Sequence, residues 1–145
     1  MKNVLLASLF LLAVFTLMQL NALSEEVGTL TINITGFQNN NGLCMVALYN
    51  SEDGFAGKGK AFRDAKVQIR DKKATCEFND IPRGTYAVRL YHDENANGKL
   101  DKNFVGLPKE SYGVSNNAKR KMGPPKYENA KFTFTENTTI DIRVD

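Results

Sequence analysis

The alternation of apolar and polar residues along the chain has the period of two that is typical of half-buried β-strands. In the first such segment, Leu30, Ile32 and Ile34 alternate with threonine and asparagine side chains. Similar segments with a β-branched or aromatic face follow at residues 43–49, 67–69, 74–78, 86–91, 131–134 and 138–144. About seven strands with hardly any helical periodicity predict an all-β fold, namely an antiparallel β-sandwich of the immunoglobulin-like or prealbumin-like type.

Turn-forming residues separate the predicted strands. Residues 38–42 are rich in asparagine and end in glycine, which predicts a hairpin between the first two strands. Glu136 and Asn137 are expected to form the turn between the last two. Residues 51–62 are expected to be mainly a loop with a single helical turn, and the aromatic residues Phe55 and Phe62 should fold its two ends back onto the core.

Residues 93–129 have little periodicity and are interrupted repeatedly by glycine, proline and asparagine. A connection of this length in a compact domain is usually functional or has a compact form of its own. The segment is too rich in apolar and aromatic residues for simple disorder, namely Phe104, Val105, Leu107, Tyr112, Val114, Met122 and Tyr127. We therefore expect one long ordered loop that forms the interaction surface of the domain.

The N-terminal segment has the features of a signal peptide. Lys2 supplies a positive charge, residues 4–20 are almost entirely apolar, and the small residues Ala22 and Ser24 follow at the spacing of a cleavage site. Residues 1–24 are thus predicted to be a signal peptide and residues 25–145 a single exported domain, periplasmic or secreted, with no membrane span after cleavage. The alternative is an uncleaved anchor, because the apolar run approaches the roughly 20 residues that span a bilayer.

The charges of the chain are nearly balanced. Its 19 basic and 16 acidic side chains give a formal net charge of +3, and removal of Lys2 lowers this charge by one. Acidic residues are interspersed among the basic ones, so the net field is weak and nucleic acid is not expected as a partner. The expected partner is instead a protein or a glycan of the cell envelope.

Two cysteines, Cys44 and Cys76, lie on the predicted inward faces of their strands. An oxidising compartment outside the cytoplasm favours a disulfide between them. The alternative is a pair of buried free thiols that pack as small hydrophobic side chains. Catalytic thiol chemistry is not indicated, because the chain has no C-x-x-C motif.

The start of the long loop has the spacing of a Ca²⁺-binding loop of the EF-hand type, with Gly98 at the sharp turn. The residues that would supply oxygen ligands are Asp93, Asn95, Asn97, Lys99 through its backbone carbonyl, and Asp101. The match then ends, because Phe104 occupies the place of the bidentate glutamate, and Glu110 or Glu128 would have to supply the missing carboxylate. The alternative is a metal-free turn, since Asn97 followed by Gly98 is itself a strong hairpin signal.

The single histidine, His92, stands at the end of a predicted strand, immediately before this loop. As a general base it would need a nucleophile and an orienting acid, and no G-x-S-x-G motif is present. We therefore expect His92 to order the loop by bonding a backbone carbonyl, and we predict no catalytic residue. The residues expected on the loop surface are His92, Tyr112, Asn116, Asn117 and Arg120.

Several blocks of the sequence resemble the DUF2141 family of uncharacterised bacterial exported proteins. They are residues 28–32, Gly42 with residues 46–50, and residues 81–88, 92–101, 103–110, 112–118 and 123–125. The resemblance covers nearly all of residues 25–145 and implies a bacterial, extracytoplasmic β-sandwich without an established activity. The two cysteines are not part of the family pattern, so a disulfide would be particular to this protein and its close relatives.

The Ile-Pro-Arg-Gly-Thr-Tyr turn at residues 81–86 also resembles the strand entry of transthyretin-like and carboxypeptidase-regulatory-like sandwiches. Within that superfold, the hydroxyisourate hydrolases use several histidines and a C-terminal Tyr-Arg-Gly-Ser motif. This chain has one histidine and ends in Arg143-Val144-Asp145, so that activity is not expected.

Three functions remain open, and the one we expect is a non-enzymatic binding or structural module that uses residues 93–129 as its interaction surface, with Ca²⁺ as a candidate ordering ion. The second is a hydrolase that uses His92 with loop residues such as Tyr112, Asn116 or Arg120. The third is a carbohydrate-binding module, in which tyrosines would have to stack on sugars because the chain has no tryptophan.

Overall fold

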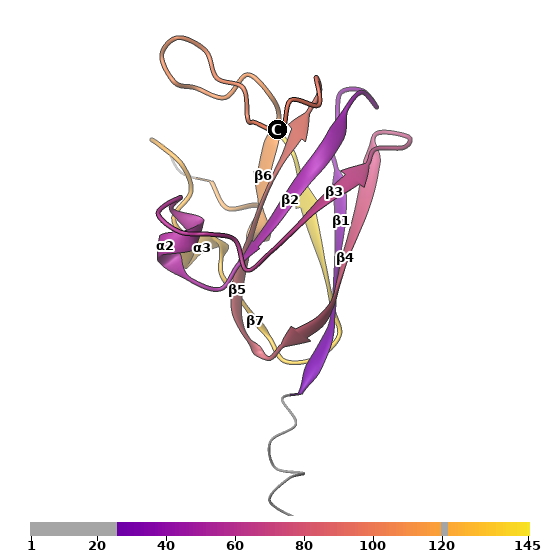
Figure 1. The fold of residues 1–145 in the computed structure, drawn as a ribbon, viewed down its shortest axis with the longest axis vertical. Coiled ribbons are helices and arrows are strands. Elements are labelled where there is room, and N and C mark those ends of the chain that lie inside the picture. Colours follow the sequence, from indigo (N-terminus) through magenta and orange to yellow (C-terminus); the bar gives the residue numbers. More distant parts are fainter. Residues whose placement is uncertain (1–25, 120–121) are drawn as a thin grey trace, which may run out of the picture.

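The computed structural model describes residues 26–119 and 122–145, which fold into two facing β-sheets with a long loop at one end (Figure 1). The signal peptide predicted at residues 1–24 lies outside the described residues. The strands of the described part are β1 (Val27–Thr35), β2 (Leu43–Tyr49), β3 (Arg63–Gln68), β4 (Lys73–Pro82), β5 (Gly84–Asp93), β6 (Tyr112–Val114), β7 (Phe132–Phe134) and β8 (Thr138–Arg143). Three short helical segments accompany them, namely α2 (Glu52–Phe55), the 3₁₀ helix η1 (Ser115–Asn117) and α3 (Tyr127–Ala130).

The two sheets differ in size and in strand direction. The smaller sheet has the order β4–β1–β8, in which β1 runs antiparallel to β4 and parallel to β8. The larger sheet has the order β3–β2–β5–β6, and β7 pairs with the beginning of β5. The predicted β-sandwich is confirmed. The described residues contain an eighth strand because β6 lies inside the segment 93–129, which was expected to be loop throughout.

The period of two in the sequence identifies the buried face of each main strand. Leu30, Ile32 and Ile34 of β1 are at most 1% exposed, and they belong to one hydrophobic core with the inward residues of β2, β4 and β5. The same core contains Tyr86, and β5 also contributes Val88 and Leu90 to it. The predicted inward faces are therefore confirmed.

The chain crosses from one sheet to the other at its first turn, so the predicted hairpin between β1 and β2 is wrong. β1 pairs with β4 and β8, whereas β2 pairs with β3 and β5. The last two strands are also separated, because β7 pairs with β5 and β8 pairs with β1. A strand with one apolar face can bury that face in either sheet of a sandwich, so the alternation does not specify its hydrogen-bonded neighbour.

A second, smaller hydrophobic cluster includes part of β5, together with α2, β6 and α3. It is formed by the buried residues Phe55, Ala87, Val114 and Ala130. Figure 1 shows α2 and α3 side by side at this edge, where they contact each other. Phe55 thus folds its loop back as predicted, but onto this satellite cluster, while Phe62 is half-buried against the main core. None of the helices in the described part is long and apolar enough to cross a membrane.

Cys44 of β2 and Cys76 of β4 lie in the main core and come from opposite sheets. Burial, and secondarily the neighbouring Cys76, raises the pKa of the Cys44 thiol to about 12. Burial, followed by the charge of Glu77, raises the pKa of the Cys76 thiol to about 11. Both residues are free thiols in the structure, so the disulfide expected between them is not formed in it.

The disulfide stays a prediction for the protein in an oxidising compartment. Protein isolated after export and unfolded without reductant is expected to have no titratable thiol, whereas reduced protein should have two. In the folded, reduced protein the raised pKa values keep both sulfurs protonated near neutral pH. They should therefore react with a thiol reagent much more slowly than after unfolding. Two titratable thiols in the exported, unreduced protein would contradict the disulfide.

Candidate functional site

The end of β5 and the loop that follows it, residues 92–111, contain most of the polar residues that the sequence pattern singles out. The loop leaves one end of the sandwich and projects beyond the strands, and it is drawn in orange at the upper left of Figure 1. It contains two different parts. Residues 93–101 and Glu110 form a hydrogen-bonded polar network, and residues 102–109 form an apolar tip.

His92 connects the loop to the rest of the fold from inside the protein. Its side chain is fully buried, and Nε2 lies 2.7 Å from the carbonyl oxygen of Asn41. A carbonyl oxygen only accepts, so Nε2 is the ring nitrogen that donates. The ring also packs edge-on against Phe37 at 5.2 Å between centroids. His92 thus anchors the link between β1 and β2, and its expected place on the loop surface is wrong.

The other ring nitrogen of His92, Nδ1, is buried without a hydrogen-bond partner among the described residues. The nearest acidic oxygen is Oε1 of Glu94, 3.8 Å away. Glu94 itself is exposed and accepts a hydrogen bond from the side-chain amide of Asn39. The His92 ring thus contacts Phe37, Asn41 and Glu94, and no hydroxyl or thiol of the described residues is bonded to it.

Gly42 lies where this link passes close to the start of the loop. Its φ is +62°, a left-handed conformation that glycine adopts without strain. A β-carbon built at Gly42 would lie 1.9 Å from the backbone oxygen of Asp93. The close passage of the two backbones thus requires the absence of a side chain.

Asp93 caps the first turn of the loop from a buried position. It is 1% exposed, and its two carboxylate oxygens accept from different backbone N–H groups. Oδ1 lies 3.0 Å from the nitrogen of Asn97, and Oδ2 lies 2.8 Å from the nitrogen of Gly98. This arrangement satisfies N–H groups in a turn whose backbone has no strand partner.

Asp101 closes the same turn from the other side. Its carboxylate accepts from the side-chain amide of Asn95 at 2.7 Å and from that of Asn97 at 3.1 Å. The amide oxygens of the two asparagines accept from backbone N–H groups, that of Asn95 from Asn97 and that of Asn97 from Lys99. The structure therefore brings together the side chains of Asp93, Asn95, Asn97 and Asp101, which the spacing in the sequence predicted.

Glu110 is the central residue that the spacing alone did not place. It is 7% exposed, and its Oε1 accepts from the nitrogen of Glu94 at 3.0 Å while Oε2 accepts from the nitrogen of Asp101 at 2.9 Å. One carboxylate thus ties together the two ends of the turn. Burial, and then the charges of Asp93 and Glu110, raises the pKa of the neighbouring Tyr91.

The side-chain oxygen atoms predicted to bind Ca²⁺ take part in these hydrogen bonds. Ca²⁺ takes six to eight oxygen ligands, and Glu110, the candidate for the missing carboxylate, is turned to backbone N–H groups. Within residues 26–119 and 122–145, no three His, Cys, Asp or Glu side chains are grouped so that they could hold a metal ion. The side-chain oxygens of the network therefore already serve as hydrogen-bond acceptors.

The tip of the loop presents apolar side chains to solvent. Phe104 is 99% exposed, and Val105 and Leu107 are 62% and 61% exposed. Asn103 holds the tip in shape, because its side-chain oxygen accepts from the nitrogens of Val105 and Leu107, at 3.0 Å each. The exposed apolar side chains are thus carried by an ordered turn.

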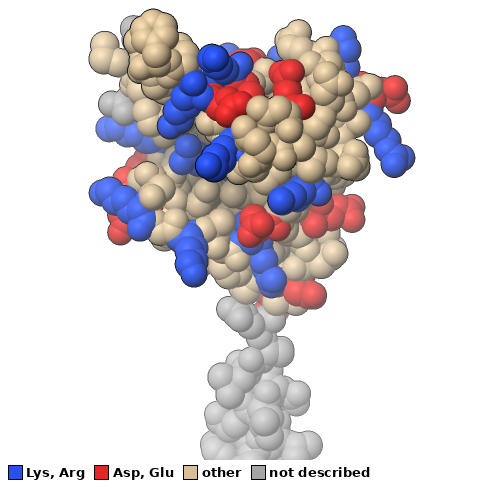
Figure 2. All heavy atoms as spheres, turned by 45° about the horizontal axis from the view of Figure 1, so that its top comes forward, with Lys and Arg blue, Asp and Glu red and all other residues tan. Residues whose placement is uncertain are grey.

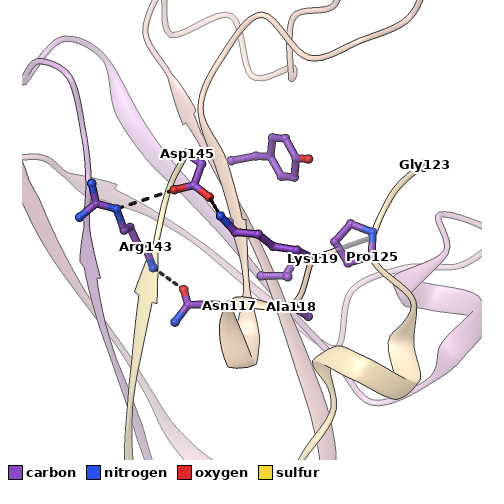
Figure 3. A pocket seen from close by; sticks show the side chains of 10 residues that line it. Asn117, Ala118, Lys119, Gly123, Pro125, Arg143 and Asp145 are labelled. Carbon is purple, nitrogen blue, oxygen red and sulfur yellow. Dashed lines mark hydrogen bonds and ion pairs between the residues drawn. The ribbon is translucent and has the colours of Figure 1, made fainter. Parts of the chain in front are cut away.

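A hollow of about 300 Å³ lies beside β6, between η1 and the end of β8 (Figure 3). The lining residues are Tyr112, Gly113, Val114, Asn117, Ala118, Lys119, Gly123, Pro125, Arg143 and Asp145. Figure 3 shows the carboxylate of Asp145 between two cations, with Nζ of Lys119 at 2.5 Å and Nε of Arg143 at 3.7 Å. The charged groups of the hollow are therefore paired with one another.

Two asparagines predicted for the loop surface, Asn116 and Asn117, lie on the surface and also stabilise the backbone. The side-chain amide of Asn116 donates to the carbonyl oxygens of Asn129 and Lys131. The side-chain oxygen of Asn117 accepts from the nitrogen of Arg143 at 2.8 Å, at the edge of β8. Both asparagines are exposed and have positive φ, which asparagine tolerates better than most residues.

Ser115 is a structural residue that the sequence did not indicate. It is fully buried, and its hydroxyl accepts from the nitrogen of Val88 at 2.9 Å and donates to the carbonyl oxygen of Ala130 at 2.5 Å. It thereby joins β5 to the end of α3. A serine in an irregular segment has no local signal that distinguishes this role from that of an exposed one.

His92, Tyr112 and Asn116, the described residues of the hydrolase hypothesis, are not joined to one another by hydrogen bonds. The ring of His92 bonds to Asn41, the side chain of Asn116 bonds to backbone carbonyls, and Tyr112 is 40% exposed at the hollow. Arg120 lies outside the described residues.

The comparisons with known proteins identify a family and no characterised relative. No curated protein matches the chain significantly, and neither does any solved structure. A family profile matches residues 32–141, which extend from inside β1 into β8 and include the whole polar network and the tip. The chain therefore belongs to DUF2141, a family described as an uncharacterized protein conserved in bacteria.

Proposed function

We propose that the protein is an exported, non-enzymatic binding module of the bacterial cell envelope and that residues 93–129 form its interaction surface. The observation that carries this proposal is the position of the exposed apolar side chains. Of the six large hydrophobic residues exposed in the described part, all but Val27 lie in this segment, namely Phe104, Val105, Leu107, Tyr112 and Met122. Exposed apolar residues that cluster on one segment mark interaction sites more often than residues scattered singly.

The way in which the segment is held supports a role in binding. The polar network fixes residues 93–101, and Asn103 orders the tip through its two side-chain hydrogen bonds. A surface that is ordered before it meets a partner loses less conformational entropy on binding. The sandwich beneath it acts as the scaffold, as is common for binding loops.

The proposal is tested by photo-crosslinking in living bacteria. A photoreactive phenylalanine analogue at position 104 is expected to form adducts with a component of the cell envelope, because Phe104 is almost fully exposed at the tip. The matched control carries the analogue in place of Thr133, an exposed residue of β7 outside the proposed surface. Equal adduct yields at both positions, or none at position 104, would contradict the proposal.

Ca²⁺ binding by the polar network is a separate prediction, in which Asp93 and Asp101 would supply the carboxylate ligands. A Ca²⁺ concentration one hundred times the dissociation constant would stabilise the protein by about 2.7 kcal/mol. That stabilisation corresponds to a rise in Tm of roughly 10 °C for a domain of this size. Asp101→Asn, which keeps the shape but removes a carboxylate, should abolish the rise. The same Tm in Ca²⁺ and in chelator would refute Ca²⁺ binding.

A further inference from the structure

We infer that the tip of the loop, residues 102–109, inserts into an anionic phospholipid surface. This inference rests on the proposed function, since it names the partner of the same interaction surface. It draws on the shape and exposure of the tip, on the pairing of its backbone, and on the distribution of charge around it.

The tip is a protrusion and not a groove. Phe104 is 99% exposed, and Val105 and Leu107 are both more than 60% exposed. In Figure 1 the loop extends away from both sheets. A small convex apolar group of this kind fits a deformable apolar medium such as the acyl region of a bilayer. Phenylalanine and leucine are also among the side chains that favour this region most strongly.

Most backbone N–H groups of the tip are already hydrogen-bonded within the loop. The nitrogen of Asn103 donates to the carbonyl oxygen of Leu107, and that of Gly106 donates to the carbonyl oxygen of Asn103. The nitrogens of Val105 and Leu107 donate to the side-chain oxygen of Asn103, and Pro108 has no N–H. An unpaired backbone N–H group is costly in lipid, so internal pairing lowers the cost of insertion.

Three exposed lysines, Lys99, Lys102 and Lys109, lie next to the tip in the sequence. None of them makes an ion pair with another residue of the described part. Basic residues that adjoin an inserted apolar group are attracted to anionic headgroups, so these lysines suit the same surface.

The acidic residues of the loop are turned away from this surface. Asp93 and Glu110 are buried and accept from backbone N–H groups, and Asp101 faces the amides of two asparagines. Glu94 is directed to Asn39 at the β1–β2 link. Figure 2 shows an uncharged protrusion at the upper left, with basic side chains between it and the acidic ones. The outward charge at the tip is therefore positive, although acidic residues are present in the loop.

The tip is attached firmly to the loop below it. Lys102 forms a β-bridge with Pro108, and the nitrogen of Lys109 donates to the carbonyl oxygen of Asp101. Asp101 is in turn held by Glu110 and by the two asparagine side chains. The polar network thus determines the direction in which the apolar side chains point.

The experiment uses the absence of tryptophan from the chain. Phe104→Trp places a single reporter on the tip without a change in the core, and Thr133→Trp places one on β7 outside the interaction surface. Vesicles that mix phosphatidylglycerol with phosphatidylcholine are expected to shift the emission of Phe104→Trp to shorter wavelength, and brominated lipid should quench it. The emission of Thr133→Trp should not change. Both variants are made in the full chain, so the N-terminal segment is the same in each.

The contribution of charge is measured in the Phe104→Trp background. Lys102→Gln combined with Lys109→Gln should weaken partition into the anionic vesicles about 25-fold, because each lysine near the surface contributes about fivefold. The matched control combines Lys58→Gln with Lys60→Gln, at two exposed lysines of the α2–β3 connection. This control should leave partition unchanged. Equal partition into vesicles of phosphatidylcholine alone would overturn the requirement for an anionic lipid.

The test separates this inference from the function on which it rests. If vesicles leave the Phe104→Trp emission unchanged while the crosslinks at position 104 persist, insertion of the tip into lipid is refuted. The partner is then a protein or a glycan. If crosslinks and emission change are both absent, the proposed function fails as well. An emission change of the same size at position 133 would overturn the tip as the inserting element.

Discussion

Gly42→Ala is expected to destabilise the protein by about 3 to 5 kcal/mol, which is in the upper range for a single substitution. The added β-carbon would lie 1.9 Å from the backbone oxygen of Asp93 and 2.8 Å from two backbone atoms of Glu94. These atoms belong to the last residue of β5 and the first turn of the loop, and they are held in place by the Asp93 and Glu110 carboxylates. The backbone therefore has to move, which strains the polar network. Urea denaturation followed by circular dichroism measures the loss.

The matched control for this prediction is Gly57→Ala. Gly57 also has a positive φ, +82°, but a β-carbon there would meet no atom within 4 Å. Only the left-handed backbone conformation is then penalised, at about 1 to 2 kcal/mol. The difference between the two variants isolates the close passage of the backbones at Gly42. Losses of equal size would show that the close passage carries no energetic weight.

Glu110→Gln is expected to destabilise the protein by about 2 to 4 kcal/mol and to loosen the loop. The carboxylate accepts two backbone hydrogen bonds from a position that is 7% exposed, whereas a glutamine side chain offers one oxygen and turns an N–H₂ group toward the second donor. Hydrogen exchange should accelerate at the nitrogens of Glu94 and Asp101, because one of them loses its acceptor and the turn that holds the other loosens. Denaturation and residue-resolved hydrogen exchange measure the two effects.

Glu128→Gln serves as the matched control for the same chemical change on the surface. Glu128 is 61% exposed and forms an ion pair with Lys131 one helical turn away, so its loss should cost less than about 1 kcal/mol. Unchanged exchange at Glu94 and Asp101 in Glu110→Gln would mean that the carboxylate does not hold the two ends of the turn together.

These two residues connect the stability of the loop to the proposed lipid contact. Glu110 lies in the part of the loop that supports the tip, and Gly42 of the β1–β2 link packs against the start of that loop. The residues that would enter the lipid are Phe104, Val105 and Leu107. Substitutions below the tip should weaken partition by disordering it, and substitutions on the tip should weaken partition without a change in stability. The two groups of variants can therefore be told apart by measuring stability and partition together.

Most of the secondary structure and of the buried surface could be predicted from local patterns. The alternation in β1, β2, β4 and β5 identified their inward faces because a strand with one apolar face has only one way to bury it. The spacing from Asp93 to Asp101 predicted which polar side chains come together, because they are close in sequence and surround one sharp turn. These features depend on neighbours within a few residues.

Features that depend on contacts distant in the sequence could not be predicted in this way. Strand β6 has only three residues and pairs with β5 across the long loop, so it shows no periodicity of its own. The buried roles of Ser115 and Glu110 depend on backbone groups that are 9 to 27 residues away. The link between β1 and β2 has the composition of a hairpin turn but crosses between the sheets.

The amino-acid sequence by itself determined that this protein is a β-sandwich, which faces of its strands are buried, and that Asp93, Asn95, Asn97 and Asp101 gather at one turn. The tertiary structure alone decided which strands pair, that His92 is buried as an anchor, and that Glu110 completes the network beneath an exposed apolar tip. The physical reason is the distance in sequence over which the deciding interactions act. Burial and turn formation are set by adjacent residues, whereas strand partners and the acceptors of buried N–H groups are chosen by the packing of the whole chain.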